Sequence, residues 1–432
     1  MTPVGVQPGP VKAGSPPAAA HRSPARRPWR LIGGVAAAVL LLGAGGAVLA
    51  PRLLHPGPAK ICADDALQAR ALDGLATFAD WLQRNDVPGY VGEVGWPAGA
   101  DEQRWSALAD TWYRAADAIG LPVTAWAAAS WPAGYPMAVY RRGSGSTSLN
   151  TAGPQSWVVG DHASTEKYRR GVVLAGGSFG AADSNPDFSS GRPGRYGYDY
   201  SYENTASYAY LAAQGIRLVR LTVSWERLQP VPGEALSPIE LGRLRTAMAR
   251  AGQAGIAVII DLHNYGSFAA GGGPRPRKLV LGSPELPTSR LADLWSRLAK
   301  ATGDERALVG YDLLNEPITL SAHGADGAKL WEQASQESVD AIRTAGSTRT
   351  IAVTAYGQTA PAQIAEFHPR AWIDDPLHRT VYEAHAYFDD DSSGHYAAGY
   401  AAELARLPHL AAAHTCRIFR DLTPSTPTFA AP

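Results

Sequence analysis

Two glutamates lie in local sequences that suit catalysis. Glu93 lies in Gly-Glu-Val-Gly and Glu316 in Leu-Leu-Asn-Glu-Pro, each at the end of a short apolar run. If their carboxyl groups face each other across a substrate bond, the ionised one can attack as a nucleophile while the protonated one donates to the leaving oxygen. Glycoside hydrolysis requires such a pair. The two glutamates therefore predict a hydrolytic site for sugars.

Other side chains could tune or extend this pair. Arg220 would keep a neighbouring glutamate ionised by charge pairing, and His263 and His385 can hydrogen-bond or relay protons. Four tryptophans at run ends or in loops could be platforms for sugar rings: Trp96, Trp126, Trp131 and Trp225. Singly, each residue has an ordinary explanation as a solvated acid, a rim ion pair, a satisfied polar group or a packed ring. The prediction depends on their coincidence at the ends of the runs.

The elements that must position these side chains alternate in a regular way from Cys62 onward. Short β-branched or aromatic runs span 90–94, 123–127, 171–175, 218–223, 257–262, 308–314, 350–354 and 380–385. Helical stretches between and before them include 64–84, 101–119, 238–254, 288–301 and 326–345. This pattern is typical of βα units around a parallel sheet. It predicts an α/β fold, a (β/α)8 TIM barrel with its chemistry at the carboxyl ends of the strands.

A doubly wound open sheet is the structural alternative. No Gly-rich phosphate loop follows any run, however, and eight is the number of strands that closes a barrel. In a closed ring, the runs that carry Glu93 and Glu316 are three steps apart, so both side chains can point across the barrel mouth. Two stretches fall outside the pattern: 274–287 is expected to be an ordered loop insertion, and 141–170 fits no element.

The first 60 residues differ from the rest of the chain. No Asp or Glu precedes Asp64, and residues 31–50 are uncharged over a length that spans a bilayer. Three arginines within 26–30 precede this stretch and only Arg52 follows closely, which predicts a cytoplasmic N-terminus and an extracellular catalytic domain. Residues 1–30 would then be a basic disordered tail, 31–50 a transmembrane anchor and 51–61 a linker.

Cleavage and secretion are the alternative to this anchor. Val48 and Ala50 suit the small-residue site of a signal peptidase. Pro51 directly after that site, the long lead and the full span favour an uncleaved anchor at the cell membrane.

The charge of the chain is balanced overall but uneven along its length. Of 432 residues, 39 are basic and 39 acidic, and seven basic residues precede Asp64, so 32 basic and 39 acidic residues remain and the body carries a net charge of −7. An acidic body argues against a nucleic-acid partner. A hydrophobic fraction of 45% is too high for a disordered chain.

The sequence implies no metal, nucleotide or organic cofactor. The run at 389–391, three consecutive aspartates, lacks the spacing of a calcium loop and is typical of a solvated acidic turn. No histidine pair has zinc-ligand spacing, no Gly-x-Ser-x-Gly elbow occurs, and two cysteines cannot form a four-cysteine zinc site.

Several motifs together resemble glycoside hydrolase family 5, the retaining cellulases. They are Asn-Glu-Pro at 315–317, Asp-Leu-His-Asn-Tyr at 261–265, Val-Arg-Leu at 219–221, His-Ala-Tyr at 385–387 and Gly-Glu-Val-Gly at 92–95. Two further segments resemble the fungal-type endoglucanase branch: Gly-Val-Val-Leu-Ala-Gly-Gly-Ser-Phe-Gly at 171–180 and Pro-Gly-Arg-Tyr-Gly-Tyr-Asp-Tyr at 193–200.

The resemblance implies a role for each matching residue. Glu316 would be the general acid/base and Glu93 the nucleophile, held and ionised by Arg220 and Tyr387. His385 would tune the acid/base. The residues implied to contact the sugar are His263, Asn264, Asn315, Trp126, Trp131 and Trp225.

One departure from the family is large. Members place the nucleophile strand after the acid/base and His-x-Tyr strands, whereas here Glu93 comes first. This order resembles a circular permutation, with 141–170 as the new connection within a domain at 62–422 and a Pro/Thr-rich tail at 423–432. Cys62 and Cys416 would both lie near the cut, where a disulfide could join the new ends. Two unpaired buried cysteines are the alternative.

The resemblance thus implies an endo-β-1,4-glucanase that hydrolyses a β-linked polysaccharide. The N-terminal segment adds a membrane anchor, and nothing in the sequence fixes an oligomeric state, so a monomer is the default expectation. Alternatives with the same barrel are another β-glycan substrate (β-1,3-glucan, mannan or xylan), transglycosylation, or an inactive barrel that only binds carbohydrate at the cell surface.

Overall fold

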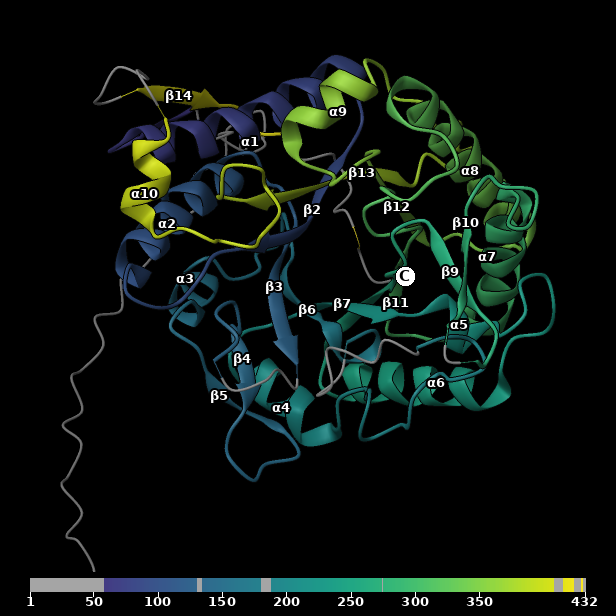
Figure 1. Cartoon of the computed structure of the whole chain (residues 1–432). Coiled ribbons are helices and arrows are strands. Elements are labelled where there is room, and N and C mark those ends of the chain that lie inside the picture. Colours follow the sequence, from purple (N-terminus) through teal and green to yellow (C-terminus); the bar gives the residue numbers. More distant parts are fainter. Residues whose placement is uncertain are drawn as a thin grey trace, which may run out of the picture. The chain divides into compact units, whose positions relative to one another are not determined.

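A closed ring of eight parallel strands forms the centre of the fold (Figure 1). The computed structural model describes residues 58–129, 134–179, 188–273, 275–407, 415–422 and 429. The ring strands are β2 (Gly89–Gly95), β3 (Val123–Ala129), β6 (Arg170–Leu174), β7 (Leu218–Val223), β8 (Ala257–Leu262), β11 (Leu308–Asp312), β12 (Thr350–Thr354) and β13 (Thr380–Tyr387). Each pairs in parallel with the next, and β2 pairs with both β13 and β3, which closes the barrel. The predicted (β/α)8 fold is confirmed.

The ring strands are almost entirely buried. Every residue of β2, β3, β7 and β8 is buried, as expected for parallel strands that helices cover on the outside and side chains fill on the inside. The sequences of β3, β7 and β8 are accordingly rich in valine, isoleucine, leucine and alanine. The eight predicted runs coincide with these strands to within one or two residues at most ends.

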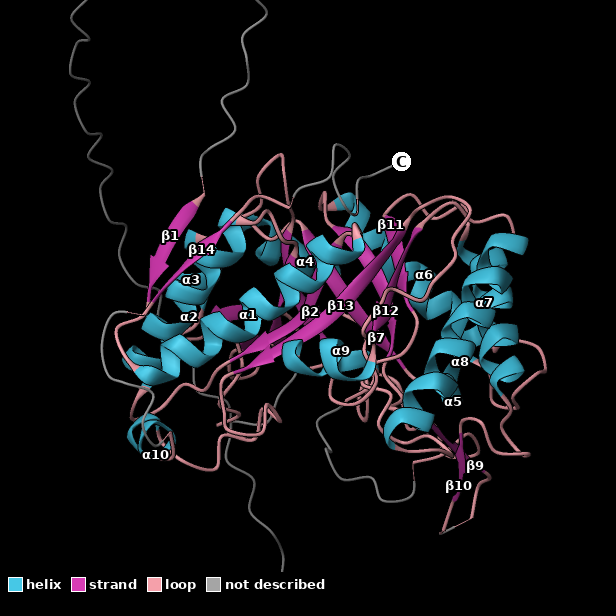
Figure 2. Cartoon of the chain, turned by 90° about the horizontal axis from the view of Figure 1, so that it is seen from above, coloured by secondary structure: helices cyan, strands magenta, loops and turns pink. Residues whose placement is uncertain are grey.

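Helices flank the strands on the outside of the ring (Figure 2). They are α1 (Ala66–Asn85), α2 (Glu102–Ala118), α3 (Ser156–Asp161), α4 (Thr205–Ala213), α5 (Trp225–Leu228), α6 (Pro238–Gln253), α7 (Thr288–Thr302), α8 (Gly324–Thr344), α9 (Pro361–Phe367) and α10 (Tyr400–Ala405), with a 3-10 turn η1 (Ala175–Gly177) after β6. Local sequence sets several ends: Asp65 caps α1 through the amides of Leu67 and Gln68, and Ser237 caps α6, which begins with Pro238.

Two hairpins extend the catalytic side of the barrel. The stretch 141–170, which fits no element in the sequence, contains the end of β4 (Tyr140–Arg142), β5 (Leu149–Ala152) and α3, and β4 continues the sheet beside β3. Part of the loop expected at 274–287 is a strand: β10 (Arg277–Val280) lies within it and pairs with β9 (Ser267–Ala270), which precedes it. Phe268 and Leu279 of this hairpin are buried, and their packing orders the segment.

Segments from both ends of the described chain meet at one edge of the domain. β1 (Ala59–Cys62) pairs antiparallel with β14 (Cys416–Phe419), and Cys62 is bonded to Cys416. The predicted disulfide is confirmed. The expected linker at 51–61 is too long by three residues, because residues 59–61 already belong to β1.

Several sequence expectations fall outside the described residues. These are the tail at 1–30, the anchor at 31–50 and most of the C-terminal tail at 423–432. Within the part of the chain that the structure describes, no helix has the length and apolar character needed to cross a membrane. Phe429 is the described part of the C-terminal tail, and it packs against Tyr90 with ring centroids 5.0 Å apart.

Candidate active site

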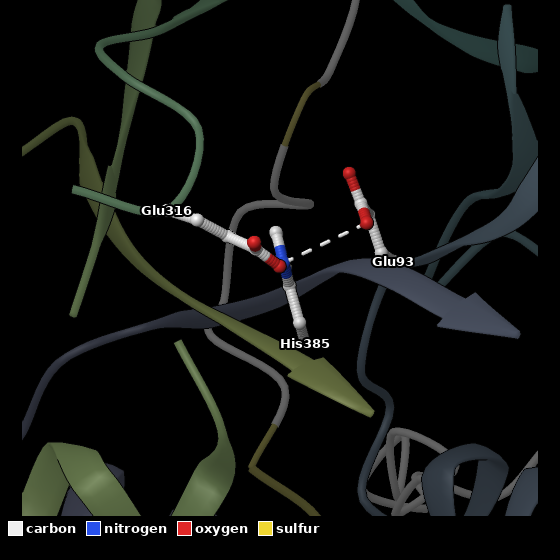
Figure 3. Close-up of side chains that lie close together, drawn as sticks. All are labelled: Glu93, Glu316 and His385. Carbon is white, nitrogen blue, oxygen red and sulfur yellow. Dashed lines mark hydrogen bonds and ion pairs between the residues drawn. The ribbon is translucent and has the colours of Figure 1, made fainter. Parts of the chain in front are cut away.

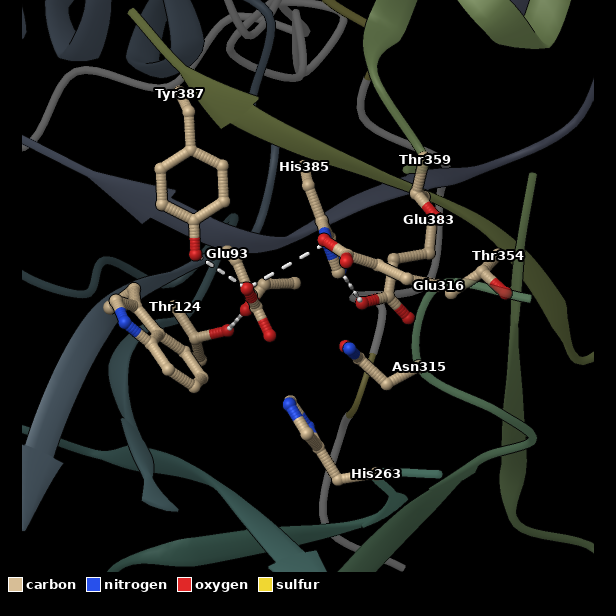
Figure 4. Close-up of polar contacts among 12 residues, drawn as sticks. Glu93, Thr124, His263, Asn315, Glu316, Thr354, Thr359, Glu383, His385 and Tyr387 are labelled. Carbon is tan, nitrogen blue, oxygen red and sulfur yellow. Dashed lines mark hydrogen bonds and ion pairs between the residues drawn. The ribbon is translucent and has the colours of Figure 1, made fainter. Parts of the chain in front are cut away.

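The barrel brings most of the predicted site residues to the carboxyl ends of its strands (Figure 4). Glu93 lies on β2, Arg220 on β7, and His385 and Tyr387 on β13. Asn315 and Glu316 follow β11, and His263 follows β8. Residues far apart in sequence meet because neighbouring parallel strands end at the same rim.

Glu93 is held as a carboxylate from two sides. Arg220 Nη1 donates to Oε1 at 2.7 Å, and the Tyr387 hydroxyl donates to Oε2 at 2.6 Å. Burial alone would raise the pKa of Glu93, but the positive charges of His385 and Arg220 outweigh it and hold the pKa below its ordinary value. The Glu93 carboxylate is therefore ionised at neutral pH, which is the state that a nucleophile needs.

His385 connects the two glutamates (Figure 3). Its Nδ1 lies 2.9 Å from Oε1 of Glu316 and 3.7 Å from Oε2 of Glu93. Its Nε2 lies 3.1 Å from Oε1 of Glu383. Burial lowers the pKa of His385, but the charge of Glu93 and the hydrogen bonds to Glu316 and Glu383 raise it to about 10. The ring is thus an imidazolium at neutral pH, with both N–H groups directed at carboxyl groups.

Glu316 is more open than Glu93. Its side chain is 17% exposed, whereas that of Glu93 is 3% exposed. Its backbone has a φ of 39°, an uncommon conformation that turns the chain sharply after β11. One oxygen of Glu316 lies within 4.8 Å of one oxygen of Glu93. The two carboxyl groups therefore face a common space, the more exposed one placed to meet a leaving group.

Asn315 and His263 line the site beside this pair. Asn315 Oδ1 accepts from Arg220 Nη2 at 2.9 Å, so its amide nitrogen points elsewhere. His263 Nδ1 lies 2.8 Å from Asp261 Oδ2, and Nε2 lies 3.0 Å from the Tyr265 hydroxyl. These partners fix the orientation of each side chain before any substrate arrives.

Trp126 lies in the middle of β3, next to His263. The two rings stack with centroids 5.6 Å apart and an interplanar angle of 19°. The indole nitrogen donates to the Tyr135 hydroxyl at 2.7 Å, and Phe179 packs edge-on at 5.9 Å. Trp126 is 7% exposed, so most of its surface is already packed.

Other predicted sugar contacts have different surroundings. Asn264 uses its amide within the protein, accepting from Trp225 N and donating to Glu226 and to Ser267 O. Trp225 is 1% exposed and donates to Gln229. Both side chains support the loops behind the site and lie away from the carboxyl pair. Trp131 lies outside the described residues.

Glu93, Glu316 and His385 are the one group of three or more His, Cys, Asp and Glu residues, among those described, with atoms spaced closely enough to hold a metal ion. A metal at His385 Nδ1 would have to displace the proton that bonds Glu316. The raised pKa of His385 opposes this displacement. The residues at 389–391 form no such group: Asp390 pairs with Arg70, whereas Asp389 and Asp391 both accept from Ser393.

Three buried acids of the site were not singled out from the sequence. Asp261, Asp312 and Glu383 lie at the level of Arg220, and all are 0% exposed. A signal was present, because Asp261 and His263, like Glu383 and His385, are two residues apart and so face the same side of an extended strand. Inward-facing polar residues repeated at that period predict a buried polar site.

Comparisons with known proteins agree with this arrangement. Residues 181–417 match the cellulase family, glycosyl hydrolase family 5. Endo-beta-1,4-glucanase B of Aspergillus niger is 28% identical over 251 residues, which cover 58% of this chain and 69% of the relative. Endoglucanase gh5-1 of Neurospora crassa is 26% identical over 233 residues, covering 52% of this chain and 54% of the relative.

Among solved structures, the endoglucanase Cel5A of Pseudomonas stutzeri is similar, with 34% sequence identity and a TM-score of 0.44. The match covers 52% of this chain and 64% of that chain. The chain therefore spans less than two thirds of both the Neurospora relative and the Pseudomonas structure.

Proposed function

Because this chain belongs to glycosyl hydrolase family 5, we propose that it is a retaining endo-β-1,4-glucanase. The observation that carries this proposal is the spacing of Glu93 and Glu316, whose nearest oxygens lie within 4.8 Å. Retaining enzymes place their carboxyl groups about 5–5.5 Å apart, whereas inverting enzymes leave about 6.5–9.5 Å for a water molecule. The glucanase relatives favour β-1,4-linked glucan as the substrate.

The reaction follows from the ionised state of Glu93 and the more exposed position of Glu316. Ionised Glu93 attacks the anomeric carbon, and the bond from that carbon to the leaving oxygen breaks as Glu316 gives its proton to that oxygen. This step leaves a glycosyl ester on Glu93 and a carboxylate on Glu316. Glu316 then takes a proton from water, whose oxygen attacks the anomeric carbon and releases Glu93. The His385 imidazolium stabilises each carboxylate in turn.

The test is a pair of isosteric substitutions. Glu93→Gln and Glu316→Gln are each expected to abolish the release of reducing ends from carboxymethyl cellulose. A fluorinated cellobioside that traps the intermediate should add its mass to the peptide that carries Glu93. Full activity in both variants, or a label on another residue, would refute the assignment. Product analysis on β-1,3-glucan, mannan and xylan, with chromatography for transfer products, would test the substrate and the outcome.

We further propose that the barrel is circularly permuted relative to its family. The family match begins at residue 181, so β2 with Glu93 and β3 with Trp126 both precede it. In space, however, β2 pairs with β13, and Cys62 lies opposite Cys416 with their Cα atoms 3.9 Å apart. In a rearranged chain, residues 165–416 would come first, a short linker would follow, and residues 62–164 would come last. This chain should fold and keep its activity. Failure to fold would contradict the permutation.

We also propose that residues 31–50 anchor a monomeric enzyme in the cell membrane, with 1–30 inside the cell and the domain at 62–422 outside. The support is the uncharged stretch, the arginines that precede it and a disulfide, which oxidising surroundings favour. The full chain should sediment with the membrane fraction, and protease added outside intact cells should digest the barrel. Recovery of a soluble barrel that starts near Pro51 would instead show cleavage, and light scattering on that barrel tests the monomer.

A further inference from the structure

A layer of acids surrounds Arg220 at the base of the site. Oxygens of Glu93, Asp261, Asp312 and Glu383 lie 2.7, 3.0, 2.6 and 3.4 Å from its guanidinium nitrogens. The basic side chains in contact with these four acids are Arg220, His385 and His263, the last through Asp261. Four carboxylates around three basic side chains leave at least one excess negative charge in a region shielded from water, which is costly.

Three oxygens of this layer have no hydrogen-bond donor. They are Asp261 Oδ1, Asp312 Oδ1 and Glu383 Oε2, and all are buried. The side chains of Asp312 and Glu383 lie within hydrogen-bonding distance of each other, on β11 and β13, which flank β12. Ionised carboxylates only accept, so two that meet in this way need a proton between them.

We propose that Asp312 is a neutral acid that donates a hydrogen bond to ionised Glu383, and that Glu383 in turn is a positioning residue which holds His385 as an imidazolium aimed at Glu316. The chain of contacts is continuous: Asp312 to Glu383, Glu383 Oε1 to His385 Nε2 at 3.1 Å, and His385 Nδ1 to Glu316 Oε1 at 2.9 Å. One buried proton then removes one excess negative charge from the layer.

The surroundings agree with a proton on Asp312. Burial raises the pKa of Asp312 well above its usual range, and the charges of Glu383 and Asp261 raise it further. The positive charge of Arg220 lowers this pKa, but by less than the other effects raise it. The charged and titratable groups that face the pair from neighbouring strands are Tyr90 and Glu93 on β2, Arg220 on β7, Asp261 on β8 and His385 on β13.

The absence of a side chain at Gly92 leaves space for the Glu383 carboxylate. A Cβ at Gly92 of β2 would lie 1.5 Å from Glu383 Oε1, so only glycine allows the carboxylate to lie there. This close approach brings Glu383 under His385. The arrangement rests on the proposed roles of Glu93 and Glu316, but the protonation state of Asp312 can be measured without catalysis.

Infrared spectroscopy tests the proton directly. Wild-type protein at pH 7 should show the carbonyl band of a protonated carboxylic acid, which shifts when carbon-13 aspartate is incorporated and disappears in Asp312→Asn. Asp261→Asn is the matched control: it is equally buried and touches Arg220, and the band should persist in it. The absence of a protonated aspartate in the wild type would overturn the proposal, whether or not any variant folds.

The pH profile of kcat/KM tests the effect on His385. In Glu383→Gln, His385 should lose its proton at lower pH, so the alkaline limb of the profile should shift to lower pH. At pH 8, kcat/KM should fall about 10- to 100-fold, the effect of one hydrogen bond to a charged group. Asp312→Asn keeps an N–H donor toward Glu383 and should leave both limbs in place. If Asp312→Asn moves the limbs as Glu383→Gln does, Asp312 is ionised and the proposal fails.

Discussion

Arg220 Nη1 lies 2.7 Å from Glu93 Oε1, although 127 residues separate them in the chain. Both side chains are buried, and the planar guanidinium also contacts Asp312 and Asn315. A lysine has one charged nitrogen and cannot reach these partners together. The geometry of Arg220, as well as its charge, is what positions the Glu93 carboxylate.

Arg220→Lys should therefore impair catalysis despite the conserved charge. Breaking a buried ion pair costs about 3–5 kcal/mol, which corresponds to a fall in kcat/KM of about 100-fold or more. The acid limb should also move to higher pH, because Glu93 loses support for its ionised form. Arg245→Lys is the control, since its pair with Asp304 is exposed. Equal effects of the two substitutions would contradict this account.

Tyr387→Phe removes the hydroxyl that donates to Glu93 Oε2 at 2.6 Å. A hydrogen bond to a charged group contributes about 1.5–3 kcal/mol, so kcat/KM should drop about 10- to 100-fold and the apparent pKa of the nucleophile should rise. Tyr396→Phe removes a hydroxyl that bonds Gly95 O instead. It should lower the midpoint of thermal unfolding without moving the pH profile.

Trp126 and Trp225 should respond differently to truncation. Trp126→Ala is expected to raise KM for cello-oligosaccharides about 10-fold or more, because a base for sugar stacking is lost. Trp225 is 1% exposed, so Trp225→Ala should reduce the free energy of unfolding by about 3–5 kcal/mol. Urea unfolding and steady-state kinetics separate the two effects. A larger change in KM for Trp225→Ala would reverse the assignment.

Asp375 should make stability depend on acid pH. Burial would raise its pKa, but Arg343 and the amides of Leu377 and Arg379 outweigh burial and lower it to about 2 from 3.8. A depressed native pKa contributes stability above pH 4 that is lost as pH falls toward 2. Asp375→Asn should cost about 1–2 kcal/mol at pH 7 and nearly nothing at pH 2. The exposed neighbour offers a control, Asp374→Asn, for which urea midpoints should be unchanged at both pH values.

The disulfide should stabilise the barrel without taking part in catalysis. Cys62 and Cys416 are 354 residues apart, and cross-links over long loops contribute about 2–5 kcal/mol. Dithiothreitol should lower the urea midpoint of the wild type and leave a Cys62→Ser, Cys416→Ser double variant unaffected. The kcat of the folded enzyme should be equal in all three samples. A change in kcat on reduction would show that the β1–β14 pair is coupled to the site.

The strands and the positions of the two glutamates on them could be predicted from the sequence. Continuous apolar runs predict buried parallel strands because local hydrophobicity is readable without a structure, and strand ends of a barrel share one rim. Glu93, Glu316 and Arg220 could be identified because each ends or interrupts such a run. The disulfide could be proposed because only two cysteines occur.

Which side chains are in contact depends on the tertiary fold and could not be predicted from the sequence. Asp312 and Glu383 lie on strands separated by β12, and their contact depends on the closure and stagger of the whole ring. Trp225 and Asn264 have the residue types of sugar ligands, but loop packing gives them partners within the protein. The burial of a side chain, its protonation state and the orientation of its ring depend on neighbours that are distant in the chain. A local sequence pattern does not identify those neighbours.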